Sequence, residues 1–239
     1  MVKTNPGRFF EDYSVGQVLQ HAVPRTVTEG ERGLYHALYP ARHALYSSDE
    51  FARDCGLPES PLDDLAAFHL VFGKTVPDVS LNAVATLGYG EGRWLKPVYA
   101  GDTLRSVSEV IGLKQNSNGK TGVVWVRTRG LNQLDEVVIE YVRWVMVRKA
   151  DVNAPAPETG VPELKKALTP QDLIVPEGLD FSNYDFALAG EAHRWGDYEI
   201  GEKIDHVDGV TVEEAEHMLA TRLWQNTAKV HFDATFRPD

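Results

Sequence analysis

The amino-acid sequence predicts an α+β fold in which a long antiparallel sheet wraps around one buried helix, and this unit then begins a second time. Three observations lead to that prediction. Three long runs after residue 101 alternate apolar and polar residues, which is typical of strands. One stretch before them is apolar at helical spacing. Residues 12–46 also align without a gap with residues 197–231.

The internal repeat keeps one offset, 185 residues, as from Asp12 to Asp197. Self-similarity of this kind indicates two copies of one structural unit. We therefore expect a first unit at residues 8–150, a Pro-rich linker and irregular connection at 151–193, and the N-terminal part of a second unit at 194–239. Identical residues stand 185 positions later for Asp12, Tyr13, Gly16, His21, Thr26, Val27, Glu29, Glu31, Leu34 and Leu38.

The first unit opens with a strand and a capped helix. A strand is expected over residues 17–28. Thr28 and Glu31 have the spacing of a capping box, so a helix should start there. Pro40 ends that helix, because its ring cannot continue the hydrogen-bond ladder.

Two further helices follow before the sheet. Residues 47–55 read as a short helix capped by Ser47 or Ser48. The next helix begins near Pro61 and is expected to be the most buried of the chain. Its apolar positions recur at i, i+3, i+4, i+7 and i+10, at Leu62, Leu65, Ala66, His69 and Phe72.

The remaining first unit reads as an antiparallel sheet. An early strand is expected near residues 83–95, and the glycines of Gly88–Trp94 suggest a bulge in it. Asn118-Gly119 is a hairpin turn between the next two strands. The three long strands are predicted at residues 102–115, 121–133 and 136–149.

Composition bounds the classes of function. The 239 residues are 43% hydrophobic and 10% aromatic, enough for a packed core. A net charge of −11 argues against a nucleic-acid partner, because phosphate binding needs clustered cations. Cys55 is the single cysteine, so no internal disulfide can form. With neither an apolar leader nor a run of 18 apolar residues, we expect a cytoplasmic protein without a membrane partner.

Long strings of the sequence resemble MaoC-like hot-dog dehydratases, among them NPGRFFEDYSVGQ, VFGKTVPDVSLNA, QNSNGKTGVVWV and YEIGEKIDHVDGVTVEEAEHM. Within that family the resemblance is greatest to members that act on mesaconyl-CoA. It covers essentially the whole chain and implies a double hot-dog fold with an incomplete second hot-dog, truncated at its C-terminal side.

The resemblance also implies an enzyme. The reaction would be the reversible hydration of a coenzyme A thioester by a hydro-lyase, mesaconyl-CoA giving β-methylmalyl-CoA. The partners implied are the acyl-CoA substrate and further copies of the chain in a homo-oligomer. No cofactor is expected beyond the coenzyme A carried by the substrate.

The family signature, Asp-x-Asn-Pro-x-His, places the expected catalytic residues in the second unit. His231 falls on the signature histidine, and imidazole can act as acid or base near neutral pH. Asn226 falls on the aspartate and Ala228 on the asparagine. An amide can orient water but cannot take its proton. A helping carboxylate would come from Glu214, Glu216 or Asp233; the alternative is that His231 only packs or caps.

The matching loop of the first unit has Ala41, His43 and Tyr46 at the three signature positions, so we expect that unit to be catalytically silent. His69 is expected to be a satisfied core histidine, with a pocket-lining role as the alternative. The histidines 193, 206 and 217 lack metal-ligand spacing, and no metal is expected. Three cations are candidates for the coenzyme A phosphates, although a solvated sheet face explains them equally well: Arg93, Lys96 and Arg105.

Two other functions remain open at this point. The chain could be a non-catalytic acyl-CoA-binding or assembly fragment that is inactive without a missing C-terminal part. Thioester hydrolysis on the same fold is disfavoured, because no carboxylate occupies the signature loop.

Overall fold

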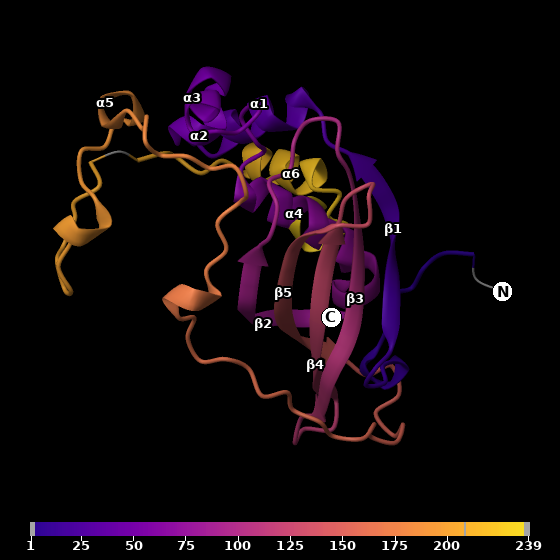
Figure 1. The fold of residues 1–239 in the computed structure, drawn as a ribbon. Coiled ribbons are helices and arrows are strands. Elements are labelled where there is room, and N and C mark those ends of the chain that lie inside the picture. Colours follow the sequence, from indigo (N-terminus) through magenta and orange to yellow (C-terminus); the bar gives the residue numbers. More distant parts are fainter. Residues whose placement is uncertain (1–2, 208, 237–239) are drawn as a thin grey trace.

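The computed structural model describes residues 3–207 and 209–236, and its centre is a five-stranded antiparallel sheet curved around one helix (Figure 1). The strand order is β1-β3-β4-β5-β2. The predicted α+β class is confirmed, as are the strands after residue 82, each to within about two residues. The strands are β1 (Val18–Thr26), β2 (Ala83–Trp94), β3 (Thr103–Gln115), β4 (Thr121–Leu131) and β5 (Val137–Arg148).

Helix α4 (Asp64–Thr75) is the helix that the sheet encloses. It begins after Asp63, whose side chain accepts a hydrogen bond from Leu65 N at 2.8 Å, so the start lies three residues later than Pro61. A π-helical turn, η2 (Val76–Ser80), continues it. The face of α4 that is buried against the sheet holds Ala66, Leu70 and Val71. The predicted stripe was offset from this face: Leu65 is 53% exposed, and His69 and Phe72 are half-buried.

The smaller helices follow their predicted caps. Helix α1 (Glu29–Leu38) starts with the capping box of Thr28 and Glu31. Helix α3 (Asp49–Asp54) is capped by Ser48, whose hydroxyl accepts from Phe51 N at 3.1 Å. One helical turn, α2 (Ala44–Ser47), was not predicted; it lies directly before α3.

The bulges expected in β2 are present. Its register against β5 shifts between Thr86 and Gly88 and again between Gly90 and Arg93. A Cβ on Gly88 would lie 2.4 Å from the Trp144 ring, so only glycine lets the strands meet here.

Short helices recur at the offset of the sequence repeat. Helix α6 (Glu214–Leu223) matches α1 residue for residue, and the turn η4 (Trp195–Asp197) matches η1 (Phe10–Asp12). The turn η5 (Lys229–His231) falls where α2 does in the first copy. Residues 203–207 and 209–211, the described counterpart of β1, do not form a strand. The reason is physical: β1 is held by hydrogen bonds to β3, and no described strand lies beside these residues.

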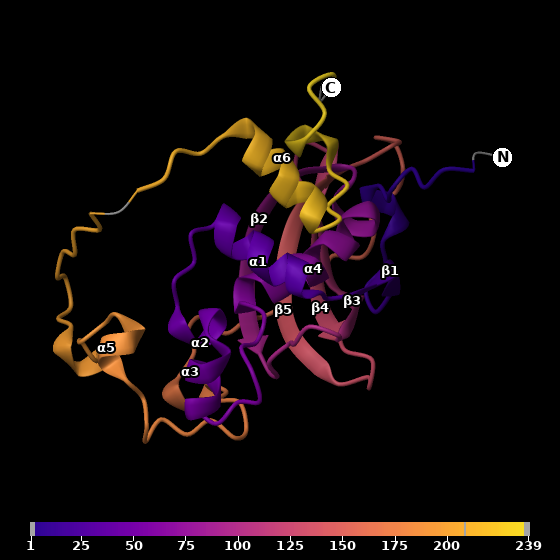
Figure 2. The ribbon, with the colours of Figure 1, turned by 90° about the horizontal axis from the view of Figure 1, so that it is seen from above.

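Between the two copies the chain runs over the outside of the molecule (Figures 1 and 2). Its regular elements are the turn η3 (Pro170–Asp172) and the short helix α5 (Phe186–Ala189). One bridge, Leu113 with Gly160, ties its start to the sheet. The chain then returns, and α6 lies beside α1 and α4. No helix in the described ranges is long and apolar enough to cross a membrane.

Candidate functional site

A cavity of about 530 Å³ lies where the second copy meets the first. Helix α4 and the end of α1 form one wall, and α6 with the loop after it forms the other. Both residues predicted for catalysis, His231 and Asn226, line it. The wall from the first copy includes Leu38, Tyr39, Pro40, His69 and Phe72; the other includes Thr211, Glu216, His217, Ala220, Thr221 and Trp224.

Trp224 fixes α6 against the first copy. Its side chain is buried in the core cluster that contains α4. Its ring stacks on His69, with centroids 5.5 Å apart and planes 18° apart. The backbones approach closely because residue 73 is glycine: a Cβ there would lie 1.9 Å from Trp224 O. His69 lines the cavity, which was the alternative to the favoured core position, and burial lowers its pKa.

Two cations of the first copy hold the turn that follows α6. Arg25 donates to the carbonyl of Leu223. Lys74 donates to Val23 O at 2.8 Å and to Gln225 Oε1 at 3.3 Å. Burial, with the Arg25 charge second, lowers the Lys74 pKa to about 8. The loop that carries Asn226 and His231 thus leaves a turn anchored by side chains 150 or more positions earlier.

His231 lies on η5, at the edge of the cavity, where solvent reaches it. Its Nδ1 shares a hydrogen bond with Nε2 of His217, at 3.2 Å, from helix α6. Burial and, second, the His217 charge lower the pKa of His231. The ring is therefore neutral near pH 7, and Nε2 is the nitrogen left for water or substrate. Sequence reasoning missed this role of His217, because no local spacing marks two histidines that meet across a turn.

Asn226 is half-buried and its side chain shapes the loop. Its Oδ1 accepts from Ala228 N at 2.9 Å, an Asx-type turn that leaves the amide NH₂ as the group free to donate. Glu216 reaches the cavity, whereas Glu214 and Asp233 line an adjoining hollow of about 270 Å³. Across the described residues, none of these carboxylates shares a hydrogen bond with His231.

The equivalent place in the first copy is chemically different. The Tyr46 hydroxyl is hydrogen-bonded to the Asp64 carboxyl, and burial together with that carboxyl raises the Tyr46 pKa. His43 is exposed and contacts the Tyr46 ring, with centroids 5.2 Å apart. The candidate phosphate-binding cations already have partners: Arg93 pairs with Glu140, Lys96 with Glu136, and Arg105 with Asp135.

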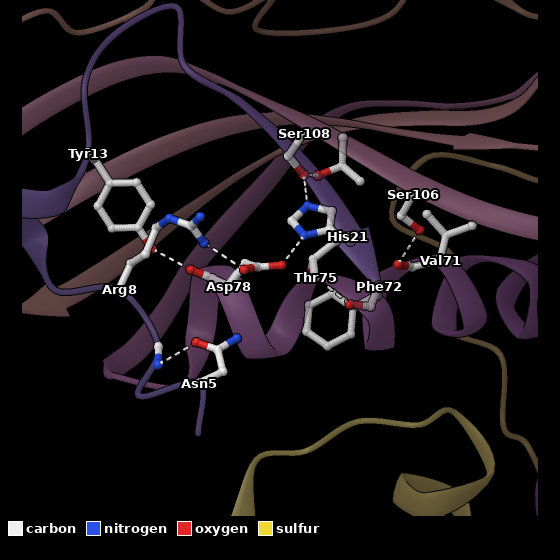
Figure 3. Close-up of polar contacts among 12 residues, drawn as sticks. Asn5, Arg8, Tyr13, His21, Val71, Phe72, Thr75, Asp78, Ser106 and Ser108 are labelled. Carbon is white, nitrogen blue, oxygen red and sulfur yellow. Dashed lines mark hydrogen bonds and ion pairs between the residues drawn. The ribbon is translucent and has the colours of Figure 1, made fainter. Parts of the chain in front are cut away.

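A second polar cluster lies just past the C-terminal end of α4, where the N-terminal segment, β1 and β3 meet η2 (Figure 3). Asp78 binds Arg8 at 2.6 Å and His21 Nδ1 at 2.8 Å, and His21 Nε2 meets Ser108 Oγ at 2.8 Å. The order Asp, His, Ser has the form of a nucleophilic triad. Ser108 and the His21 side chain are fully buried, however, so no substrate reaches them. The cluster ties β1 and β3 to η2.

Comparisons with known proteins bear on this site. The family model described as mesaconyl-CoA hydratase matches residues 2–239. A mesaconyl-CoA hydratase of Cereibacter sphaeroides is 75% identical over 238 residues, which cover 100% of this chain and 69% of that protein. A β-methylmalyl-CoA dehydratase of Chloroflexus aurantiacus is 62% identical over 231 residues, covering 97% of this chain and 66% of that protein.

Solved structures give the same picture of the fold. A MaoC-domain protein from Chloroflexus aurantiacus superposes with a TM-score of 0.94 at 61% identity, over 98% of this chain and 66% of that one. A Mycobacterium tuberculosis protein with a double hot-dog fold superposes with a TM-score of 0.67 at 21% identity, over 95% of this chain and 69% of that one. The chain thus spans about two thirds of the length of these relatives, and its hot-dog architecture is confirmed.

Proposed function

This chain belongs to the mesaconyl-CoA hydratase family, and from that premise we propose that its protein adds water reversibly to mesaconyl-CoA, giving β-methylmalyl-CoA. Its relatives are named for a hydratase and a dehydratase, the two directions of one hydro-lyase reaction. The observation that carries the proposal within this chain is the cavity in which His231 and Asn226 of the second copy face α4 of the first.

His231 is proposed as the acid and base. In the hydration direction its neutral Nε2 takes a proton from water while the oxygen bonds to the β carbon of the thioester. The imidazolium then returns that proton to the α carbon, so atoms and charge balance. In dehydration the same ring removes the α proton and protonates the leaving hydroxyl. The lowered pKa of His231 suits the base form to neutral pH.

His217 is proposed as a positioning residue. Its contact with Nδ1 orients the His231 ring. For Nε2 to act as the base, Nδ1 carries the ring proton and donates it to Nε2 of His217. Asn226 is proposed to donate its amide to the water or to the thioester oxygen, because its Oδ1 is already engaged. This chemistry needs no cofactor other than the coenzyme A of the substrate.

The test is a substitution with a matched control. We expect His231→Ala to lower kcat for mesaconyl-CoA by roughly 10²- to 10⁴-fold, the usual contribution of one acid–base group. The control is His193→Ala, a histidine whose hydrogen bonds are to nearby Glu191. The protein is expressed from its complete coding sequence, and product is followed by chromatography. Equal turnover in the two variants would remove His231 from the mechanism.

The other functions considered from the sequence have less support. A non-catalytic acyl-CoA-binding fragment finds none among the curated relatives, whose names are those of enzymes. We propose that the protein is cytoplasmic, as expected from the sequence, and that it forms a homo-oligomer.

A further inference from the structure

The inner face of β5 carries one charged residue, Arg143, among apolar ones. Residues 139, 141, 143, 145 and 147 alternate onto that face. Ile139 and Tyr141 belong to one apolar cluster, and Val145 and Val147 belong to the other. Arg143 lies between them with 0% of its surface exposed. A buried guanidinium costs free energy unless an anion compensates it, and an apolar side chain here would have joined the two clusters.

The contacts of Arg143 are all to neutral groups. Nη1 donates to Ser80 Oγ at 2.9 Å, and Nη2 donates to Thr75 Oγ1 at 3.1 Å. The guanidinium carbon lies 4.6 Å from the centroid of the Phe72 ring. Nε has no hydrogen-bond partner, and neither does the buried hydroxyl of Tyr141, two residues away on the same face. Within residues 3–207 and 209–236, no carboxylate forms an ion pair with Arg143.

Other arginines of the sheet form ion pairs with a carboxylate. On the opposite face of β5, Glu140 accepts from Arg93, Arg127 and Arg129. The carboxylate of Asp78, on η2, is already held by Arg8 and His21 (Figure 3). The positive charge of Arg143 is therefore matched by no neighbouring anion, and two buried donors beside it are unused.

Phe72 connects this place with the candidate active site. Its ring contacts the Arg143 guanidinium and also lines the cavity that contains His231. It is half-buried, so its ring is not locked inside the core. The Phe72 ring thus lies in contact with both the guanidinium and the cavity.

We propose that Arg143 is a specificity-determining residue that binds the free carboxylate of a dicarboxylic acyl-CoA thioester. The inference rests on the proposed function, since mesaconyl is the acyl group of a dicarboxylic acid and keeps one carboxylate. The edge formed by Nε and one Nη matches a carboxylate in a bidentate manner. The Tyr141 hydroxyl supplies a third donor, and Phe72 moves aside to admit the group.

The test uses two saturated thioesters that cannot be hydrated, so it does not depend on turnover. Succinyl-CoA carries a terminal carboxylate where butyryl-CoA carries a methyl group. Calorimetric titration of the complete protein should show succinyl-CoA binding roughly 10- to 100-fold more tightly, as expected of a hydrogen-bonded charge pair. In Arg143→Met the ratio of the butyryl-CoA Kd to the succinyl-CoA Kd should fall to near one, while the affinity for butyryl-CoA should be unchanged.

The control is Arg127→Met, which removes an arginine of the opposite face that pairs with Glu91 and Glu140; it should keep the wild-type ratio. Retention of that ratio in Arg143→Met overturns the proposal, as does an equal loss for both thioesters. A wild-type ratio near one also overturns the proposal, whether or not Arg143→Met folds, because it refutes a carboxylate site. Failure to hydrate mesaconyl-CoA beside a ratio that depends on Arg143 would instead refute only the proposed reaction.

Discussion

The two copies of the repeat place different chemistry at one structural position. In the first copy the position holds Tyr46, a half-buried phenol hydrogen-bonded to Asp64, and its raised pKa keeps it protonated at neutral pH. In the second copy it holds His231, whose lowered pKa keeps it neutral and able to accept a proton. On the proposed function, surroundings that push these two pKa values apart would leave the first copy silent and the second able to act as a base. The two copies share a scaffold, but the residues at this position differ in their pKa.

The largest expected effect comes from exchanging the two residues. The double variant Tyr46→His, His231→Tyr should lose mesaconyl-CoA turnover by roughly 10²-fold or more, because a phenol does not replace a neutral base at pH 7. Steady-state kinetics measure the loss. The single change Tyr46→Phe, which removes only a hydroxyl, should stay within about threefold of the wild type. Full activity in the exchanged protein would show that either copy can perform the chemistry.

The next largest effect is expected on the stability of the contact between α6 of the second copy and α4 of the first. Gly73→Ala forces a Cβ against Trp224 O and should destabilise the docking of α6 by about 1–3 kcal/mol. Hydrogen exchange of the α6 amides measures it. The matched control is Gly33→Ala in α1, where a Cβ meets nothing within 4 Å. That variant should gain about 0.5–1 kcal/mol from helix propensity. Unchanged α6 protection in Gly73→Ala would mean that the close approach is not needed.

A smaller effect is expected on the pH dependence of stability, to which His21 and its counterpart His206 should contribute differently. Burial lowers the pKa of His21, so the unfolded chain binds more protons than the folded one below about pH 6.5. Stability should therefore fall as the pH drops from 6.5 toward the folded pKa, by at most about 1.4 kcal/mol per pH unit. His21→Asn should flatten this dependence in urea titrations. His206→Asn, at an exposed position, should leave it unchanged; equal slopes in both would contradict the assignment.

The smallest effect lies at the helix starts. Helix α1 has a capping box at Thr28, whereas Glu213 precedes α6 without a side-chain cap. Glu213→Ser should create a cap with Glu216 at its third position and stabilise α6 by about 0.5–1 kcal/mol. Amide exchange in the first turn of α6 reports it. Faster exchange than in the wild type would contradict the expected cap.

The sequence predicts local structure well and distant contacts poorly. The strands and α1 follow from alternation and capping, which are properties of neighbouring residues. The packing of Trp224 on His69 and the pair of His217 with His231 depend on a return of the chain that no short-range pattern encodes. Arg143 is an intermediate case: the two-residue period of β5 places it among apolar positions, so the sequence itself marks it as a buried cation.

The dependence of kcat/KM on pH tests the central claim most directly. If neutral His231 is the base, activity with mesaconyl-CoA should be level near pH 7 and fall with a slope of one at low pH, with an apparent pKa below the usual value of about 6.5. In His217→Asn the fall in activity at low pH should move up toward pH 6.5, because a charge that lowers the His231 pKa has been removed. A fall at the same pH in both proteins, or activity that rises as the pH falls, would contradict the account.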